Sequence, residues 1–236
     1  MIDRETKENI MGKLAGLTGS ILSGLVYDDE CEDEDQDFSD ISDKVNAYDY
    51  RCGRSKLVLE FYDNDDYVVK IPIKKHVDCG IVEQYDCAFL HDPHDNPDDY
   101  CKIEKEMYEV ACKSGVEDMF AGTWKIGEID GYPIYASEKV DYTFEEVDKD
   151  WIPGELDIEF RPFTELDEDI KKIGYKTNMF LSYDAIDLII QQNGIDRTKE
   201  LMKFLSTNHI TDLHSGNVGI DSDGKVKIID YPGFFG

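Results

Sequence analysis

The chain has 236 residues, which suits one domain of ordinary size or two small lobes. Hydrophobic residues make up 41% and aromatic residues 11%, enough to build a core and too many for a wholly disordered chain. The 53 acidic residues outnumber the 25 basic ones, and the resulting charge of −28 repels nucleic-acid phosphates. We therefore expect an acidic protein with no general role in binding nucleic acids.

The sequence contains no pattern typical of a membrane-spanning helix or a secretory signal. No apolar run approaches the roughly 18 residues of a membrane-spanning helix, so we expect no membrane association. The N-terminus lacks the charged start, apolar run and small-residue cleavage site of a signal peptide. The six cysteines contain no C-x-x-C pair, which favours free thiols in a reducing compartment. Together these features predict a cytoplasmic protein.

Residues 1–27 are predicted to hold a helix, because apolar residues recur there every three or four positions. Two interpretations are open: the helix packs on its own domain, or it mediates contact with another protein from the end of a tether. The tether would be residues 28–44, where ten acids and no base occur between Asp28 and Asp43. Self-repulsion and scarce apolar surface predict a disordered linker or a loosely attached loop. The apolar face consists of Ile10, Leu14, Leu17, Ile21 and Leu25.

Two β-hairpins are predicted beyond residue 45, from β-branched and aromatic residues that flank turn residues. In the second strand of the first hairpin, Lys70 shares a face of the sheet with Val68 and Pro72. A lysine that points inward needs an anion as its partner. The strands are 57–62 and 67–73 in the first hairpin, and 120–129 and 132–140 in the second.

A helix is predicted at 101–113, between the two hairpins. Glu104 lies at the edge of its apolar face, whereas Glu106 points about 200° away from Glu104. Residues 74–100 precede this helix and look like an insertion. They are rich in histidine and cysteine, so a structural zinc site is an alternative to an ordinary loop, although no spacing matches a known finger. The apolar face of the helix is Ile103, Met107, Val110 and Ala111; the potential zinc ligands are His76, Cys79, Cys87, His91, His94 and Cys101.

The second half of the chain begins with an acidic, loop-rich segment at 141–169. Helices are then predicted within 165–193 and at 196–208. The stretch that follows, 210–233, indicates a loop, a short strand (218–220), an Asp-Gly turn and a second strand (226–229).

Three polar residues stand at fixed spacing in this last stretch: Asp212, Asn217 and Asp230. A hairpin between Asn217 and Asp230 returns both side chains to the same end of a two-stranded ribbon. A carboxylate and an amide oxygen there form a hard-oxygen site that suits Mg²⁺, which commonly bridges substrate phosphates. Asp212, in the loop just before, could orient or deprotonate an attacking hydroxyl.

This pattern resembles the protein-kinase-like superfamily, in which a catalytic loop H-R-D-x-x-x-x-N precedes a D-F-G metal ligand. The loop Asp212-Leu-His-Ser-Gly-Asn217 is similar to the D-L-H-x-G-N loop of aminoglycoside- and choline-kinase-like members, and to small kinase-like proteins of bacteriophages. The resemblance covers residues 45–233.

The resemblance also implies roles for residues upstream. Lys70, in Val68-Val-Lys-Ile71, corresponds to the lysine of V-A-I-K that contacts the nucleotide phosphates, and Glu104 to the glutamate that pairs with it. Gly53 stands where the last glycine of the Gly-rich loop would lie, so Ser55 and nearby backbone N–H groups would donate to phosphate, with Arg54 or Lys56 adding charge. By the same analogy Ser137 is the gatekeeper, and the backbones of Glu138 and Val140 meet the adenine edge.

Several features depart from the family pattern. The H-R-D triplet is replaced by Ile210-Thr-Asp212, and D-F-G by Asp230-Tyr-Pro-Gly233. The first two glycines of the Gly-rich loop are Tyr48 and Tyr50. No activation segment or substrate helices follow Gly236, so we expect a truncated second lobe and an acceptor that the sequence does not identify.

The sequence thus predicts an α+β, bilobal, kinase-like fold with a truncated C-lobe, behind an N-terminal helix and acidic linker. The expected function is an ATP- and Mg²⁺-dependent phosphotransferase that acts on a hydroxyl of a protein or small molecule, in the host cytoplasm if a phage encodes it. The alternative is a nucleotide-binding or inactive kinase-like interaction protein. The expected segments are 1–27, 28–44, an N-lobe at 45–140 with its insertion, and a minimal C-lobe at 141–236.

Overall fold

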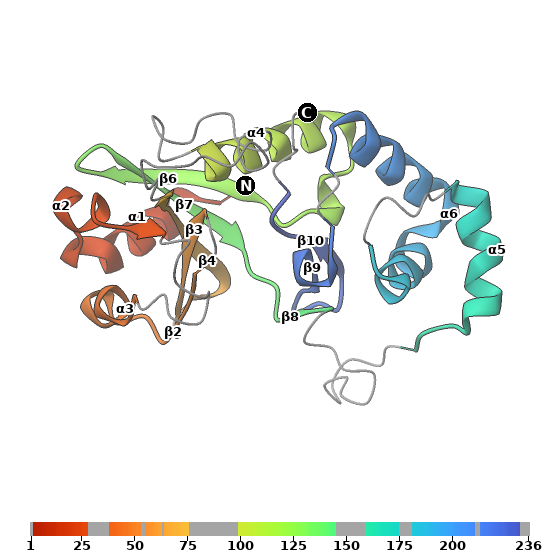
Figure 1. The fold of residues 1–236 in the computed structure, drawn as a ribbon, viewed down its shortest axis with the longest axis horizontal. Coiled ribbons are helices and arrows are strands. Elements are labelled where there is room, and N and C mark those ends of the chain that lie inside the picture. Colours follow the sequence, from red (N-terminus) through yellow and green to blue (C-terminus); the bar gives the residue numbers. More distant parts are fainter. Residues whose placement is uncertain are drawn as a thin grey trace, which may run out of the picture. The chain divides into compact units, whose positions relative to one another are not determined.

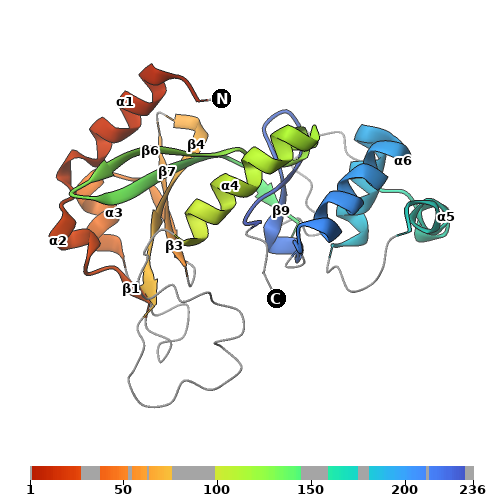
Figure 2. The same cartoon turned by 90° about the horizontal axis from the view of Figure 1, so that it is seen from above.

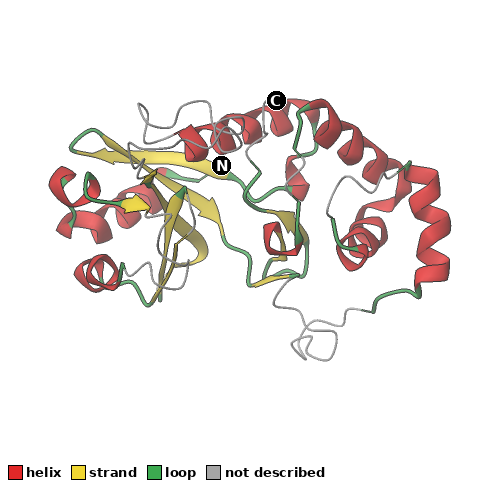
Figure 3. Ribbon diagram, in the orientation of Figure 1, coloured by secondary structure: helices red, strands yellow, loops and turns green. Residues whose placement is uncertain are grey.

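The computed structural model is an α+β protein that contains both helices and an antiparallel sheet (Figures 1 and 3). The chain divides into two compact units. The first comprises Met1–Lys105 and Gly122–Lys139, and the second Glu106–Ala121 and Val140–Phe235. The structure describes residues 2–27, 38–52, 55–62, 64–75, 99–144, 159–174, 181–210 and 213–231.

The first unit is built on a five-stranded antiparallel sheet with the strand order β2-β3-β4-β7-β6. Its β3–β4 and β6–β7 hairpins are those that the sequence predicts. The turn between Ile129 and Tyr132 is at the expected position, whereas β4 starts at Asn64, three residues before the predicted strand. The strands are β2 (Asp49–Cys52), β3 (Lys56–Phe61), β4 (Asn64–Pro72), β6 (Thr123–Ile129) and β7 (Tyr132–Glu138).

Strand alternation gives the sheet two different faces. One face carries apolar side chains such as Leu59 and Val69, which pair across β3 and β4 and belong to a hydrophobic cluster with the N-terminal helices. The opposite face carries Lys70 and faces α4 (Asp99–Ser114), the helix that follows β4 and β5 in the chain. In Figures 1 and 2, α1–α3 and α4 accordingly lie on different sides of the sheet.

The N-terminal segment packs on its own unit, which is the first of the two interpretations that its sequence allows. Its apolar residues, including Leu14 at 0% exposure, lie in the same cluster as the sheet. The segment is not one helix as predicted: Leu17 is extended, and the Thr18 side chain caps a new helix by accepting from the Ile21 N–H. The elements are α1 (Arg4–Lys13), η1 (Leu14–Gly16) and α2 (Gly19–Leu22).

The acidic segment also contains a helix where we expected a linker. Helix α3 (Ser39–Val45) buries Ile41 and Val45, which are four residues apart and so share a face toward the apolar cluster. The helix ends at Asn46 in the left-handed conformation (φ 55°), a common terminator. The remaining part of the predicted linker, 28–37, lies outside the described residues.

A short parallel pair, β1 (Val26–Tyr27) with β5 (Lys74–Lys75), extends the first unit. Most of the predicted insertion lies outside the described residues, and the potential zinc site lies there with it. The potential ligands in this part are His76, Cys79, Cys87, His91 and His94. The one potential ligand that is described, Cys101, is buried in α4.

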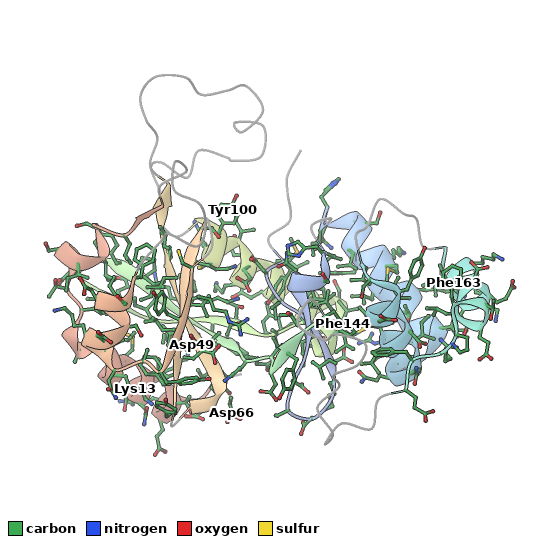
Figure 4. All side chains as sticks on the ribbon, turned by 60° about the horizontal axis from the view of Figure 1, so that its bottom comes forward. Lys13, Asp49, Asp66, Tyr100, Phe144 and Phe163 are labelled. Carbon is green, nitrogen blue, oxygen red and sulfur yellow. The ribbon has the colours of Figure 1, made fainter. Side chains whose placement is uncertain are left out.

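The second unit is mainly helical, and its apolar cluster joins the helices to a three-stranded sheet of order β10-β9-β8. Helix α6 (Tyr183–Thr207) is interrupted at Gly194 (φ 78°, ψ 163°), so it forms two helical stretches. The first stretch and α5 (Phe163–Ile173) correspond to the helices predicted within 165–193, and the second stretch to the helix predicted at 196–208. Figure 4 shows the side chains that fill the two units. The elements are η3 (Glu117–Met119), β8 (Tyr142–Thr143), α5 (Phe163–Ile173), α6 (Tyr183–Thr207), η4 (Ser215–Asn217), β9 (Val218–Ile220) and β10 (Val226–Ile228).

Among the helices that the structure describes, none is both long enough and apolar enough to cross a membrane.

Candidate functional site

A buried ion pair between Lys70 and Glu104 is the main polar feature of the first unit. The Lys70 ammonium donates to Glu104 Oε1, and both side chains are buried: Glu104 is 0% exposed and Lys70 is 5% exposed. Burying either charge alone would be costly, so each residue compensates the charge of the other. The sheet and α4 therefore meet through the two residues that the sequence singles out.

Glu104 accepts from two further side chains. The Lys56 ammonium lies 3.3 Å from Glu104 Oε2, and the Thr123 hydroxyl donates to Oε1 at 3.2 Å. Thr123 is also within 3.1 Å of the Ser137 hydroxyl, the expected gatekeeper. We call Lys56, Lys70, Glu104, Thr123 and Ser137 the Glu104 cluster. Each of the five residues is buried.

Strand register explains why these residues meet. Val58 is opposite Lys70, so Lys56, two residues earlier on β3, lies on the same face as Lys70. Across the sheet, Thr123 is opposite Ser137. From the sequence we expect Lys56 only as an additional charge beside the Gly-rich loop, and we expect no site role for Thr123. Lys56 is two residues before Val58, a spacing that puts both on one face of a strand, and this spacing is the signal in the sequence that indicates an inward position for Lys56.

The buried face of α4 differs from the predicted one. Glu104 is at the centre of that face rather than at its edge, because Cys101, Met107 and Ala111 are the buried positions around it. Val110, predicted to be in the core, is 37% exposed. Glu106 is exposed, as expected for a residue that points away from the sheet.

A second polar group joins Tyr48, just before β2, to Glu60 on β3 and Lys139, just after β7. The Tyr48 hydroxyl donates to Glu60 (2.5 Å), and Lys139 contacts both Glu60 (2.7 Å) and the Tyr48 hydroxyl (2.8 Å). The hydrogen bond with Glu60 raises the pKa of Tyr48 above its ordinary value. Burial alone would lower the pKa of Lys139, but the bonds to Glu60 and Tyr48 outweigh it and raise that pKa. Tyr48, where the resemblance leads us to expect the first glycine of a Gly-rich loop, is thus bonded to β3 and to the end of β7.

The other residues that we expect to bind the nucleotide are Gly53, Ser55 and Glu138, and the last two form hydrogen bonds through their backbones. Gly53 lies outside the described residues, and the Ser55 carbonyl accepts from the Ile73 N–H (2.9 Å). The Glu138 N–H donates to the Gly122 carbonyl (2.9 Å), and the Glu138 carboxylate accepts from the Gly122 N–H (3.0 Å). An adenine contact from the Glu138 backbone would therefore have to use its carbonyl oxygen.

Val140 opens the second unit and packs against the β9–β10 hairpin. A Cβ at Gly219 would lie 2.6 Å from the Tyr142 carbonyl oxygen and 2.8 Å from Val140 Cγ2. Only glycine allows β8 and this segment to approach β9 so closely.

The β9–β10 hairpin carries the expected metal ligands. Its antiparallel register pairs Val218 with Ile228, and the Ile229 N–H donates to the Asn217 carbonyl (2.9 Å). Asn217 and Asp230 therefore lie at the same end of the hairpin, as their spacing predicts. Asn217 is buried and Asp230 is half-buried. Their amide and carboxylate oxygens are donors of the type that Mg²⁺ prefers.

The backbone of Asp230 is in the left-handed region, with φ of 51°. Residues other than glycine adopt this conformation rarely, and such residues cluster at functional sites. The next residue fixes the chain there: Tyr231 is buried, its hydroxyl donates to the Ala121 carbonyl (2.5 Å), and its ring packs edge-on against Phe120. The hairpin end that carries Asp230 is thus anchored within the second unit.

The expected catalytic residue Asp212 lies outside the described residues. The loop beside it is ordered by its own contacts: Leu213 is fully buried, and the His214 imidazole accepts from the Gly216 N–H (3.1 Å). No group of three or more His, Cys, Asp or Glu side chains that could hold a metal occurs in the part of the chain that is described.

Comparison with known proteins adds no family assignment, since no family model, curated protein or solved structure matches the chain.

Proposed function

We propose that the protein is an ATP- and Mg²⁺-dependent phosphotransferase of the protein-kinase-like type, with a hydroxyl group as acceptor. The observation that carries the proposal is the buried Lys70–Glu104 pair. In protein kinases the phosphate-binding lysine lies on the third strand of the N-lobe and pairs with a glutamate on the helix that follows. Here Lys70 lies on the third strand of a five-stranded antiparallel sheet in chain order, and Glu104 on the next helix.

The pair suits a nucleotide because a lysine held by a buried carboxylate has a defined position. Each lysine ammonium has three N–H donors, so its bond to Glu104 does not exclude a bond to a phosphate oxygen. Lys70, oriented by Glu104, would contact the α- and β-phosphates, and the Glu138 and Val140 backbones would contact the adenine. This chemistry is mainly positioning and charge stabilisation.

Asn217 and Asp230 fit Mg²⁺ through their oxygen donors and their common end of the β9–β10 hairpin. A bound Mg²⁺ would neutralise negative charge on the β- and γ-phosphates.

Asp212 would act on the acceptor. The hydroxyl oxygen of the acceptor forms a bond to the γ-phosphorus, the bond between that phosphorus and the β–γ bridging oxygen breaks, and ADP leaves. The hydroxyl proton passes to the Asp212 carboxylate, which acts as general base. The acceptor is a protein or small molecule.

The proposal predicts different effects for the two kinds of residue. Lys70→Met should weaken ATP·Mg²⁺ binding at least about tenfold, since a charged hydrogen-bond donor is lost. Asp212→Asn should leave ATP affinity within about threefold but lower γ-phosphate transfer at least about a hundredfold, as expected when a general base is removed. Isothermal titration measures the affinity, and γ-labelled ATP measures transfer to protein or water.

Lys125→Met is the matched control, because Lys125 lies on β6 of the same sheet but pairs with exposed Glu128 (2.8 Å). It should bind ATP like the wild type. If the wild-type protein binds ATP but transfers no phosphate, the enzyme assignment is wrong. If Asp212→Asn transfers phosphate at the wild-type rate, the role of Asp212 as general base is wrong. Absence of ATP binding by the wild type would leave the interaction-protein alternative.

A further inference from the structure

We propose that two exposed aromatic residues of the second unit, Phe163 and Tyr183, form a docking surface for an arginine-rich segment of a partner protein. Phe163, at the start of α5, is 54% exposed, and Tyr183, at the start of α6, is 47% exposed (Figure 4). Their ring centroids are 4.9 Å apart, and the rings meet edge to face. Single exposed aromatic residues need no explanation, but aromatic residues that touch one another at a surface are typical of interfaces. This inference does not depend on the proposed function.

The charge around the two rings indicates the kind of partner. Within four positions of Phe163 or Tyr183 in the sequence there are five acidic residues and one basic residue, Arg161. The surface therefore attracts a cationic partner, and it disfavours both a nucleic acid and a second copy of a chain with a charge of −28. The five acids are Glu159, Glu165, Asp167, Asp184 and Asp187.

The positive ends of two helices do not reverse this local charge. Both rings stand at helix starts, where backbone N–H groups give a partial positive charge. Each of these helices has an acid in its first turn, Glu165 in α5 and Asp184 in α6, which offsets that charge. Glu159 and Glu165 are both exposed, and neither forms an ion pair with another described residue.

Arg161 does not supply a free positive charge, because it holds the base of the surface together. Its backbone N–H and its Nε donate to the Asp187 carboxylate (2.6 and 2.5 Å), and its Nη1 donates to Asp169 on α5 (2.8 Å). Asp187 is one helical turn after Tyr183 and is 1% exposed, whereas Arg161 is two residues before Phe163. These bonds fix the starts of α5 and α6 to each other, so the two rings lose little conformational freedom when a partner binds.

The geometry of the rings favours arginine as the side chain that they bind. An edge-to-face pair leaves at least one face of each ring uncovered by the other ring, and a guanidinium group stacks on such a face. Tyr48 in the first unit already has a cation there, since the Lys139 ammonium lies 5.4 Å from its ring centroid. In the described part of the chain, no cation lies over Phe163 or Tyr183. Arginine suits this surface better than lysine, because its planar group can stack on a ring while its N–H donors reach carboxylates such as Glu165.

The experiment measures binding of the full chain to a labelled synthetic peptide in which arginine and serine alternate, by fluorescence anisotropy at about 150 mM salt. Two matched peptides carry lysine or the neutral analogue citrulline in place of arginine. We expect the arginine peptide to bind at least about threefold more tightly than the lysine peptide, because only arginine both stacks and forms several hydrogen bonds. The citrulline peptide should not bind measurably, since it has no charge.

Substitutions that keep an apolar side chain but remove the ring test the surface itself. The double variant Phe163→Leu/Tyr183→Leu should weaken binding of the arginine peptide at least about fivefold, through loss of the cation–π contacts. The control is Tyr62→Leu, because Tyr62 is a 79% exposed aromatic residue of the first unit, and it should bind like the wild type. Glu165→Gln should also weaken binding, whereas Asp196→Asn, at a carboxylate of α6 that is 99% exposed, should not.

Several results would overturn the inference. If the wild type does not bind the arginine peptide, the surface has no such partner. Unchanged affinity in the double leucine variant would assign binding to the general acidity of the chain. The melting temperature of that variant should fall by no more than about 5 °C, the equivalent of the ring contact alone, and a much larger fall would show that the chain itself covers the rings. Sedimentation velocity of the wild type should show a monomer, and a dimer that the leucine substitutions dissociate would assign the surface to a second copy of the chain.

Discussion

A fully buried carboxylate such as Glu104 is compatible with a stable fold only if nearby donors compensate its charge. Lys70, Lys56 and Thr123 provide those donors from three strands. The cluster therefore links β3, β4 and β6 to α4, and its loss would affect stability as well as any binding function.

Replacing this carboxylate by a neutral amide should expose its structural role. We predict that Glu104→Gln lowers the free energy of unfolding by about 3 kcal/mol, because two buried ammonium groups lose their shared counter-charge. Urea denaturation, followed by circular dichroism, measures the change. Glu106→Gln, on the exposed side of the same helix, should change stability by less than about 0.5 kcal/mol. Equal effects of the two substitutions would contradict the buried position of Glu104.

At this scale the sequence predicts a good part of the site. Alternation along a strand points Lys70 inward, and helical spacing distinguishes Glu104 from Glu106. The sequence predicts only a loop position for Lys56, because composition does not show that a strand already begins there, three residues after Gly53. The pairing of Thr123 with Ser137 depends on strand register, which contacts between distant segments decide.

At the scale of elements, the N-terminal segment is part of the first unit rather than a separate module. Ile10, Leu14 and Leu22 are each no more than 2% exposed and lie in one cluster with the strands. Asp130 strengthens this attachment, because its carboxylate accepts from the Gly19 N–H (2.7 Å). These contacts argue that the segment completes the core on one face of the sheet.

Truncation of a core residue in this segment should therefore destabilise the protein. We predict that Leu14→Ala lowers the free energy of unfolding by about 3 kcal/mol, as for other large-to-small changes in cores. The control is Val110→Ala, an exposed apolar truncation on α4, which should change it by less than about 0.5 kcal/mol. A detached docking helix would instead tolerate Leu14→Ala as well as it tolerates the control.

Helix α3 shows where composition misleads. Net acidity predicts disorder across 28–44, yet a few apolar residues at helical spacing, Phe38, Ile41 and Val45, are enough to hold Ser39–Val45 on the cluster. The spacing of apolar residues does not predict the break between α1 and α2 either, because the helical spacing continues without interruption to Leu25. The break depends instead on a cap, the Thr18 side chain, whose contribution is local.

At the scale of the molecule, the α+β class and the order of hairpin, helix, hairpin, helices and hairpin follow from patterns in the sequence. The division into two units does not follow from periodicity alone, because α4 contributes residues to both. The proposed function rests on two sets of residues, the Glu104 cluster in the first unit and the Asn217–Asp230 pair in the second. The central claim is that the protein binds ATP and that this binding depends on Mg²⁺ and on Asp230.

Calorimetric titration of ATP, with and without Mg²⁺, tests that claim most directly when the wild type is compared with Asp230→Ala. Asp223→Ala is the control, because Asp223 is an exposed carboxylate (77%) in the turn at the other end of the same hairpin. The account predicts Mg²⁺-dependent binding in the wild type and in Asp223→Ala, and loss of the Mg²⁺ dependence in Asp230→Ala. Wild-type protein that gives no heat with saturating ATP, or an Asp230→Ala variant with unchanged Mg²⁺ dependence, would contradict it.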